Sequence, residues 1–538
     1  MSHVVDPTTP TSSPAAAPET SSQASAPAAG ETSQGTLGLP QASAPAAGET
    51  SQGTLGLPQA SAPAAGETSQ GTLGLPQAPA PAAGETSQGT LGLPQATALV
   101  VGGVLGTGIF LLPATLAKYG TISILALGLV TIGALAIAAI LGGLGARVPA
   151  AGGPYAYARA AFGEFPGFLT AWSFWITAWV GNAAIAVAWV GYVNYFLHWD
   201  SMPGKIAIAL VGLWIPALIN LSGVGNTGLF QVVTTVLKVV PLLFVAVVGL
   251  FFVEGGNFGE FNTSDENFLG ALQVSAALVV FAYSGIEAAS VAARKVENPE
   301  RDIGRASIHG TLACAALYML STIAVMGTVP HAELVDSSAP FSDALNHMFG
   351  GGPWGGVMAA VAIVSGIGAL NGWTLLCAEM PYAAAKDGVF PRRFAVVDRA
   401  GVPVFGVLVA AVLTSVVVAV NHVWSEDAFE TILLLATVTT VIPYLSSASA
   451  QLLWLVTRER AVTRAALAKD LTIAVAGLLF ALWMLHGAGM DAVLKSLIML
   501  VLGIPVHLRV KAARGAYRPG DKEASRVEVE GATPAMRE

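Results

Sequence analysis

Long apolar runs separated by short polar segments dominate the chain from Ala96 onward. A helix needs about 20 apolar residues to cross the hydrocarbon core of a bilayer. We count twelve runs close to this length, at residues 96–117, 122–144, 168–197, 206–221, 229–253, 268–292, 308–328, 356–385, 403–420, 428–456, 471–487 and 492–508. The fourth run and the last two are shorter than the rest. The pattern predicts an all-α integral membrane protein with twelve transmembrane helices.

Composition supports this prediction and excludes other classes. Only 11% of the residues are charged and the mean hydropathy is +0.65, whereas soluble domains are about 25% charged. A net charge of -8 offers no basic surface for nucleic acid. The two cysteines, Cys314 and Cys377, lie in apolar runs and indicate buried packing. We find no nucleotide-binding motif, metal-ligand cluster or nucleophile–His pairing, so neither an enzyme nor a cofactor is expected.

Residues 1–95 have a different composition and contain no Lys or Arg. An 18-residue unit close to ASAPAAGETSQGTLGLPQ runs four times over residues 24–95. Two Leu per unit cannot bury a core, so we expect a disordered low-complexity tail. We expect no secretory signal, because no positively charged start precedes an apolar stretch. The predicted organisation is a tail at 1–95, a membrane domain at 96–511 and a cytoplasmic C-terminal tail at 512–538.

Positive charge predicts the orientation of the membrane domain. With the N-terminus inside, 21 of the 25 Lys and Arg residues lie in inner loops or in the C-terminal tail. Only Lys118, Lys205 and Lys495 fall outside, and Lys238 lies within a span. We therefore expect a multi-pass protein of the plasma (inner) membrane with both termini cytoplasmic.

The first span contains a glycine cluster, with Gly102, Gly103, Gly106 and Gly108 in the middle of the membrane and Pro113 after them. Such a cluster suits an unwound stretch whose free N–H groups bind a carboxylate. It equally suits close helix packing through small residues. On this cluster alone the two interpretations remain open.

The sixth span favours the unwound stretch. Its Ser284-Gly285 pair is followed by Glu287, and a carboxylate inside a bilayer costs about 2.5–3.5 kcal/mol and normally marks a pathway. Spans one and six are the first members of two five-helix sets. Interrupted helices at matching positions of two halves are typical of inverted-repeat transporters with a midplane site.

Several segments together resemble the amino acid–polyamine–organocation transporters, nearest to the arginine/agmatine antiporters and their basic amino acid/polyamine exchanger relatives. The segments are VVGGVLGTGIFLLPATLA, GGPYAYARAAFG, FWITAWVGN, GIEAASVAARKVENPERDI, NGWTLLCAEMPYAAAKDGVFP and VIPYL. The resemblance covers roughly residues 91–511. It implies a LeuT-type fold, with a five-plus-five inverted repeat and two extra helices. It also implies a homodimer that exchanges small molecules by alternating access.

The resemblance also assigns a substrate site. The substrate carboxylate would bind backbone N–H groups around Thr107 and Gly108, in the stretch that includes Gly103 and Val104. The α-amino group would bind the carbonyls of the sixth-span break. Those carbonyls belong to Phe281, Ala282 and Ser284.

Further residues match positions that gate the family's site or line it. Trp373 resembles an aromatic gate residue and Asn182 a residue of the side-chain pocket. Tyr444 matches an inner gate, Glu287 a glutamate linked to gating and protons, and Tyr155 a tyrosine linked to the pH response.

Four positions depart from the arginine exchanger and reduce its contacts to a guanidinium group. Gly103 replaces an asparagine, Phe281 a tryptophan, Phe174 a tyrosine and Ala436 a serine. The resemblance therefore supports the transporter fold more strongly than it supports an arginine-specific pocket.

Lys238 is a further departure, about halfway through the fifth span. Its ammonium cannot reach the interface, so it needs partners inside the bundle. It resembles a lysine that replaces a bound cation in neutral and broad-range relatives, with carbonyls of the first-span break as partners. A purely structural pairing with backbone carbonyls is the alternative interpretation.

These observations favour a secondary transporter that exchanges a cationic amino acid for its amine product. A neutral or broad-range amino acid permease or exporter is the alternative, favoured by Lys238 and the apolar replacements. A transporter-like sensor with the long tail as its signalling arm is a more distant alternative.

The tail is predicted to be dispensable, because it has no apolar face with which to dock. A chain starting near Leu91 should insert and transport at the rate of the full chain in proteoliposomes. Loss of substrate binding after truncation, with the amount of inserted protein unchanged, would instead give the repeats a part in transport.

Overall fold

The computed structural model describes residues 91–149, 152–222, 224–424, 428–457 and 463–515. The expectations for the repeats, and for the C-terminal tail beyond residue 515, fall outside these residues. The described part is helical, and its one extended pairing is a bridge between Leu91 and Val296. This bridge holds the start of the first helix against the segment that follows the sixth span.

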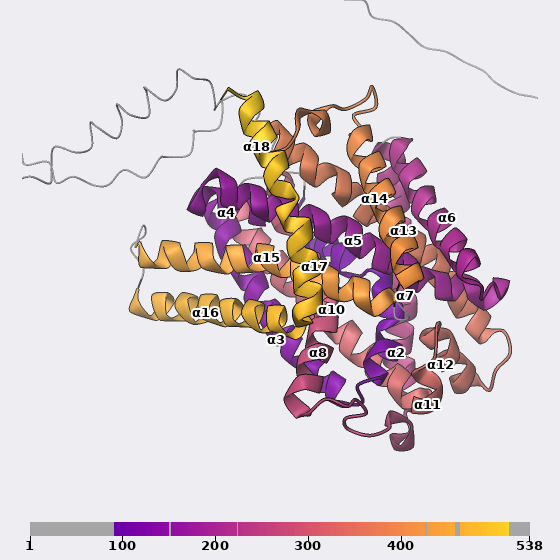
Figure 1. Ribbon diagram of the computed structural model, residues 1–538. Helices are drawn as coiled ribbons and strands as arrows, with labels where there is room; N and C mark the ends of the chain where they lie inside the picture. Colours follow the sequence, from indigo (N-terminus) through magenta and orange to yellow (C-terminus); the bar gives the residue numbers. More distant parts are fainter. Residues whose placement is uncertain (1–90, 150–151, 223, 425–427, 458–462, 516–538) are drawn as a thin grey trace, which may run out of the picture. The chain divides into compact units, whose positions relative to one another are not determined.

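The helices follow the predicted order along the chain (Figure 1). The first half comprises α1 (Leu93–Val104), η1 (Thr107–Phe110), α2 (Leu112–Ala117), α3 (Ile122–Arg147), α4 (Pro154–Phe162), α5 (Glu164–Leu197), α6 (Met202–Leu221), α7 (Val224–Val248), η2 (Gly249–Phe252), η3 (Gly255–Phe258), α8 (Phe268–Val280), η4 (Phe281–Tyr283), α9 (Ala288–Val291) and η5 (Ala293–Lys295). The second half comprises α10 (Pro299–Thr328), α11 (His331–Leu334), α12 (Pro340–Phe349), α13 (Trp354–Lys386), η6 (Arg392–Ala395), α14 (Val404–Trp424), α15 (Ala428–Val456), α16 (Arg464–Gly487), α17 (Gly489–Val501) and α18 (Gly503–Ala513).

Nine stretches of the described chain are long and apolar enough to cross a membrane. They are Ile122–Arg147, Glu164–Leu197, Met202–Leu221, Phe268–Val291, Pro299–Thr328, Trp354–Lys386, Phe429–Val456, Arg464–Gly487 and Gly489–Ala513. The other three predicted ranges coincide with shorter apolar helices, at Leu93–Val104, Val236–Phe252 and Val404–Val420. The predicted all-α fold is thereby confirmed for the described residues, and each predicted range consists mainly of helix.

The first and sixth spans are interrupted, as the sequence predicts. The first consists of α1, the short η1 and α2, and α1 continues to Val104, so Gly102 and Gly103 are helical. The break in this span is therefore narrower than the glycine cluster and is centred on Leu105 and Gly106. In the sixth span, α8 ends at Val280 and α9 begins at Ala288, with η4 and a non-helical turn between them.

The two breaks touch each other through glycine. Gly285 has a φ of +113°, and a Cβ there would lie 2.4 Å from the carbonyl carbon of Gly103. Only glycine allows this backbone conformation and this approach. Both interpretations of the first-span glycines therefore hold, for different residues: Gly103 serves close packing and Gly106 lies in the break.

The helices pack as two groups. In the first group, α10 packs against α1 and α3, and α3 packs against α8. In the second, α5 packs against α13 and α15, with α6 and α14 packed against α5 and α13. The breaks lie where the groups meet, because η1 contacts α5 and α13 while α1 contacts α10. We call the boundary between the two groups the seam, and the candidate site lies there.

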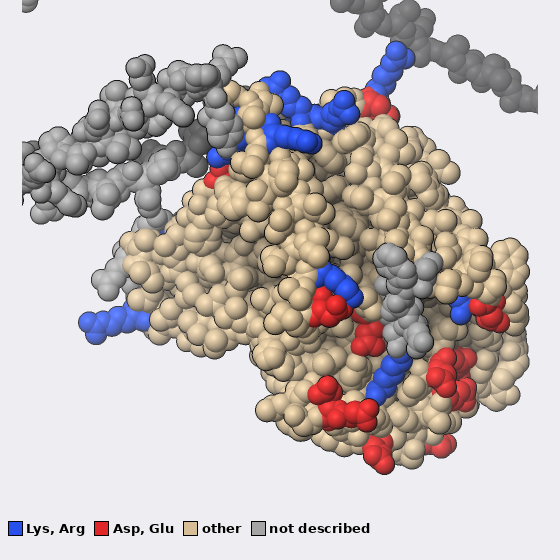
Figure 2. Space-filling model, in the orientation of Figure 1, with Lys and Arg blue, Asp and Glu red and all other residues tan. Residues whose placement is uncertain are grey.

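Basic and acidic side chains gather at opposite ends of the bundle (Figure 2). Lys511 and Arg514 lie at the end where α18 finishes. At the other end, near α11 and α12, exposed acidic residues predominate, namely Glu254, Glu260, Asp265, Glu266, Glu333 and Asp336. The sequence predicts that the basic end is the cytoplasmic one, and this orientation stays a prediction.

Candidate functional site

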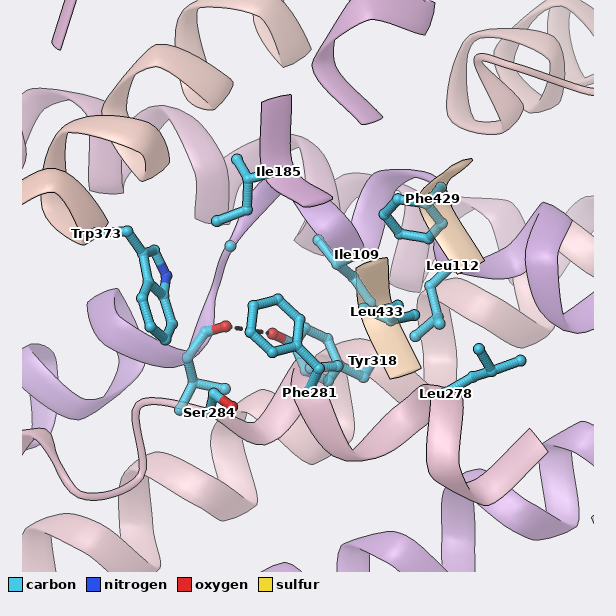
Figure 3. Close-up of a pocket in the computed structure, with 13 residues that line it drawn as sticks. Ile109, Leu112, Ile185, Leu278, Phe281, Ser284, Tyr318, Trp373, Phe429 and Leu433 are labelled. Carbon is cyan, nitrogen blue, oxygen red and sulfur yellow. Dashed lines mark hydrogen bonds between the residues drawn. The ribbon is translucent and has the colours of Figure 1, made fainter. Parts of the chain in front are cut away.

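A buried cavity lies at the seam, between the two helix breaks (Figure 3). Its lining consists of Val104, Gly106, Ile109, Leu112, Ile185, Leu278, Phe281, Ala282, Ser284, Tyr318, Trp373, Phe429 and Leu433. Ser284 and Trp373 lie at one end, and Phe429, Leu433 and Leu112 lie at the other. The cavity offers about 20 Å³ to the centres of water molecules, which is room for about one water. An amino acid or a diamine is larger, so binding requires the lining to open.

Two tyrosines satisfy the carbonyls at the ends of the first break. The Tyr318 hydroxyl, from α10, donates to the Val104 carbonyl at 2.7 Å. The Tyr192 hydroxyl, from α5, donates to the Phe110 carbonyl at 2.7 Å. Tyr318 lines the cavity (Figure 3), whereas Tyr192 is not among the lining residues. These bonds hold the interrupted backbone without water, which the bilayer interior requires.

The sixth-span break places aromatic and polar groups on the cavity. The Phe281 ring lies 5.7 Å from the Trp373 ring, at an interplanar angle of 35°. The backbone N–H of Ser284 donates to the Phe281 carbonyl at 2.9 Å. The Ser284 hydroxyl is hydrogen-bonded to the Thr440 hydroxyl of α15 at 3.2 Å. A polar contact therefore crosses the seam beside the aromatic pair.

Glu287 lies three residues after Ser284, which lines this end of the cavity, and is not itself a lining residue. Its carboxylate is 2% exposed and accepts the Gly285 N–H at 3.1 Å and the Tyr444 hydroxyl at 3.3 Å. Glu287 belongs to the first-group break and Tyr444 to α15 of the second group. The Glu287–Tyr444 bond therefore joins the two groups. The sequence placed both residues at an inner gate, and the structure brings them into contact.

Asn182 lies behind the aromatic pair. A Cβ on the neighbouring Gly181 would meet the Phe281 ring at 2.3 Å, and Asn182 Nδ2 donates to the Thr374 hydroxyl at 3.1 Å. Asn182 is 4% exposed, yet in the described structure its Oδ1 atom has no hydrogen-bond partner. A buried amide oxygen normally has a partner. In this conformation the atom is therefore an unused hydrogen-bond acceptor.

Lys238 is 1% exposed on α7. The predicted hydrogen bonds to carbonyls of the first break are not present in this conformation. Within the described residues, its ammonium has neither a hydrogen bond nor an ion pair. The proposed cation-like role remains a prediction.

Tyr155 lies on α4, beside the inner end of the sixth span, where the Gly152 N–H donates to the Val291 carbonyl at 3.3 Å. Its hydroxyl donates to Asp387 Oδ2 at 3.0 Å and accepts from Arg159 Nη1 at 3.2 Å. Burial first, and then the negative charge of Asp387, raise the pKa of Tyr155 above its ordinary value. Tyr155 therefore stays protonated in this conformation and connects α4 to the end of α13.

The structure brings part of the predicted site together. The cavity lining contains Val104, Phe281, Ala282, Ser284 and Trp373. Gly103, Phe174, Asn182 and Ala436 are not among the lining residues. Thr107 and Gly108 belong to η1, the short turn that follows the break.

The sequence did not indicate the lining residues Tyr318, Phe429 and Leu433. Tyr318 is a lone tyrosine in an apolar span, and Phe429 and Leu433 are apolar residues at the start of another. Only the tertiary contacts distinguish them from ordinary packing residues. No group of three or more possible metal ligands occurs among the residues that the structure covers.

The sequence matches one family profile and is similar to several known transport proteins. The sequence profile of the amino acid permease family matches residues 91–506. The putrescine transporter PotE of Escherichia coli (strain K12) is 30% identical over 408 residues, which cover 75% of this chain and 92% of that protein. The arginine/ornithine antiporter of Pseudomonas aeruginosa is 32% identical over 433 residues, which cover 77% of this chain and 89% of that protein.

A third relative is the cadaverine/lysine antiporter of Escherichia coli (strain K12), which is 30% identical over 358 residues, or 65% of this chain and 80% of that protein. Among solved structures, the nucleobase-cation-symport-1 family transporter Mhp1, closed with bromovinylhydantoin bound, superposes with a TM-score of 0.45. It is 14% identical and covers 79% of this chain and 94% of that chain.

The bond from Tyr318 to the first break makes a testable contribution to stability. Tyr318→Phe should lower the free energy of unfolding by about 0.5–1.5 kcal/mol, because the buried Val104 carbonyl loses the hydroxyl and keeps only the Gly106 N–H, which donates to it at 2.7 Å. Thermal melting of the purified protein measures this effect. The control is Thr322→Val, one turn further along α10, where the described structure gives the buried hydroxyl no hydrogen-bond partner. Equal melting temperatures for the two variants would mean that the Tyr318 bond contributes nothing.

Proposed function

Because the chain belongs to the amino acid permease family, we propose that it is a secondary transporter that exchanges a cationic amino acid for a related amine. The observation that carries the proposal is the meeting of two interrupted helices at a buried cavity. Interrupted helices are the usual way in which such carriers bind charged groups at the midplane. The arginine/ornithine and cadaverine/lysine antiporters among its relatives support this substrate class.

The proposed membrane arrangement has twelve crossings. The nine long apolar stretches and the three shorter helices account for them. We further propose a five-plus-five inverted repeat with two extra helices and both termini in the cytoplasm. The separation of charge in Figure 2 and the equivalent breaks in spans one and six support this arrangement.

In this proposal each end of the substrate has its own partners. A carboxylate binds N–H groups at the start of η1, and the adjacent ammonium binds carbonyls of the sixth-span break. A second, distal cation reaches Asn182 Oδ1 past the rings of Phe281 and Trp373. Aromatic faces attract cations by about 0.5–2 kcal/mol, so recognition needs no acidic side chain in the cavity.

Transport then requires the two helix groups to move relative to each other. The Glu287–Tyr444 bond closes the end nearest Ser284, and it must break for that end to open. Movement at the seam exposes the cavity to one side of the membrane at a time. Strict exchange follows if substrate must be bound before the groups can move.

A neutral amino acid carrier is the second candidate. The specific observation in its favour is that the described lining contains no acidic or basic side chain. A substrate without a distal charge would leave Asn182 Oδ1 unused. Substrate profiles therefore separate the two functions.

Counterflow in proteoliposomes tests the proposal against arginine, agmatine, lysine, ornithine, putrescine and neutral amino acids. We expect exchange of cationic substrates. Asn182→Leu should reduce it about tenfold or more, because a hydrogen bond to a charged group contributes about 1.5–3 kcal/mol. Ser365→Ala, which removes a buried hydroxyl elsewhere on α13, is the control. Exchange of neutral amino acids alone would establish the second candidate.

Glu287→Gln tests whether this carboxylate carries a proton during the cycle. The amide can still accept a hydrogen bond from Gly285 or Tyr444, so substrate binding should be largely retained. It cannot be protonated at the pH values of transport, so we expect slower turnover and a flatter pH–rate profile. Exchange rates measured against pH check this, with Glu266→Gln at the exposed surface as the control. A profile identical to that of the unmodified chain would reduce Glu287 to a structural group.

A further inference from the structure

A second tyrosine–carboxylate hydrogen bond lies at the opposite end of the cavity from Glu287. The Tyr119 hydroxyl donates to Glu430 Oε1 at 2.6 Å. Neither residue belongs to the site described so far. The distance is typical of a hydroxyl bound to a carboxylate, so Glu430 is the charged partner.

The position of this bond follows from the helices that carry it. Tyr119 is the second residue after α2, the last part of the interrupted first span, and packs against the cores of both helix groups. Glu430 lies in the first turn of α15, between Phe429 and Leu433, which both line the cavity. Figure 3 places Phe429 and Leu433 near Ile109 and Leu112 of the first span. The Tyr119–Glu430 bond therefore crosses the seam at the end of the cavity that Phe429 and Leu433 line. We call this end the mouth of the cavity.

Helix α15 supplies one residue to each of the two tyrosine–glutamate hydrogen bonds. On α15, Glu430 and Tyr444 are fourteen residues apart, or about 21 Å at 1.5 Å per residue. At one end α15 contributes the tyrosine and the first group contributes the carboxylate. At the other end these roles are reversed. The cavity is thus enclosed between two tyrosine–glutamate bonds that join the two groups.

The mouth contains an acidic side chain, which the described cavity lining lacks. The described lining has no acidic side chain, whereas Glu430 is half-buried and its other oxygen is not used by Tyr119. It lies at the end where exposed acidic residues gather, among them Glu260 and Glu266. Among the carboxylates that the structure describes at this end, Glu430 is flanked by the lining residues Phe429 and Leu433, so a cation that approaches from this end meets it next to the cavity.

We propose that Glu430 is an additional binding site for the ammonium group of the substrate at the mouth of the cavity. When the mouth is closed, the Tyr119 hydroxyl occupies this carboxylate. When the mouth opens, a primary ammonium takes the place of the hydroxyl and is then passed to the aromatic pair inside. This site rests on the proposed function, because it requires a cationic substrate.

Three variants separate a cation-binding site from a simple closure. Glu430→Gln keeps an acceptor for Tyr119 but removes the charge, Tyr119→Phe removes the closing bond but keeps the charge, and Glu260→Gln removes an exposed charge from the same end. The apparent KM for each substrate is measured from the α15 N-terminal side, in vesicles of determined orientation. We expect Glu430→Gln to raise the KM for cationic substrates about tenfold or more.

Tyr119→Phe should leave that KM unchanged or lower it, because the carboxylate is then free for the substrate. Glu260→Gln should have no effect. Equal increases in KM for Tyr119→Phe and Glu430→Gln, or an unchanged KM for Glu430→Gln, would overturn the site and leave only a closure. If Glu430→Gln does not fold, Glu430→Asp retains the charge on a shorter side chain. A KM for cationic substrates that rises by the same factor in Glu430→Asp as in Tyr119→Phe would report the closing bond alone and would also overturn the site.

The exchange measurements distinguish a failure of the Glu430 site from a failure of the proposed function. If the unmodified chain exchanges no cationic substrate, the proposed function and the Glu430 site both fall. If it exchanges them normally and only the Glu430 variants behave like the control, the proposed function stands and the site alone is wrong.

Discussion

Backbone polar groups inside a bilayer must find partners within the protein, and the structure depends on how two interrupted helices meet this requirement. The first break is held by hydroxyl groups of Tyr318 and Tyr192, which come from opposite helix groups. The second break turns at Gly285, whose backbone lies against Gly103. The carbonyls of Val104 and Phe110 thereby obtain partners within the protein.

The seam between the helix groups explains why binding and movement are coupled. The cavity lies at this seam, and hydrogen bonds cross it at both ends, from Tyr444 to Glu287 and from Tyr119 to Glu430. Each is a single hydrogen bond, and a net contribution of about 0.5–3 kcal/mol is small enough to be broken and remade during a cycle. The large apolar contacts within each group stay intact when the groups separate.

Much of this arrangement could be predicted from the sequence, for physical reasons that concern particular residues. Gly106, the Ser284-Gly285 pair and Glu287 are costly in a membrane helix, and the two spans that hold them are interrupted. The family resemblance indicated Glu287 and Tyr444 separately as gating residues, and the hydrogen bond between them comes from the structure. Tyr318 and Tyr192 were not predicted, because a tyrosine in an apolar run looks alike whether it packs or caps a carbonyl. Lys238 lacks the predicted carbonyl partners in this conformation, since partners of a buried charge depend on tertiary geometry.

The central claim is that the two helix groups move against each other so that the ends of the cavity open in turn. Spin-label distances in proteoliposomes measure this directly, with one pair at Leu125 and Phe196 near the mouth and another at Arg301 and Val396 at the opposite end. All four side chains are exposed, and both native cysteines are buried. During exchange, the account predicts two distance populations in which one pair lengthens as the other shortens. Single, unchanged distances for both pairs in a chain that exchanges substrate would contradict it.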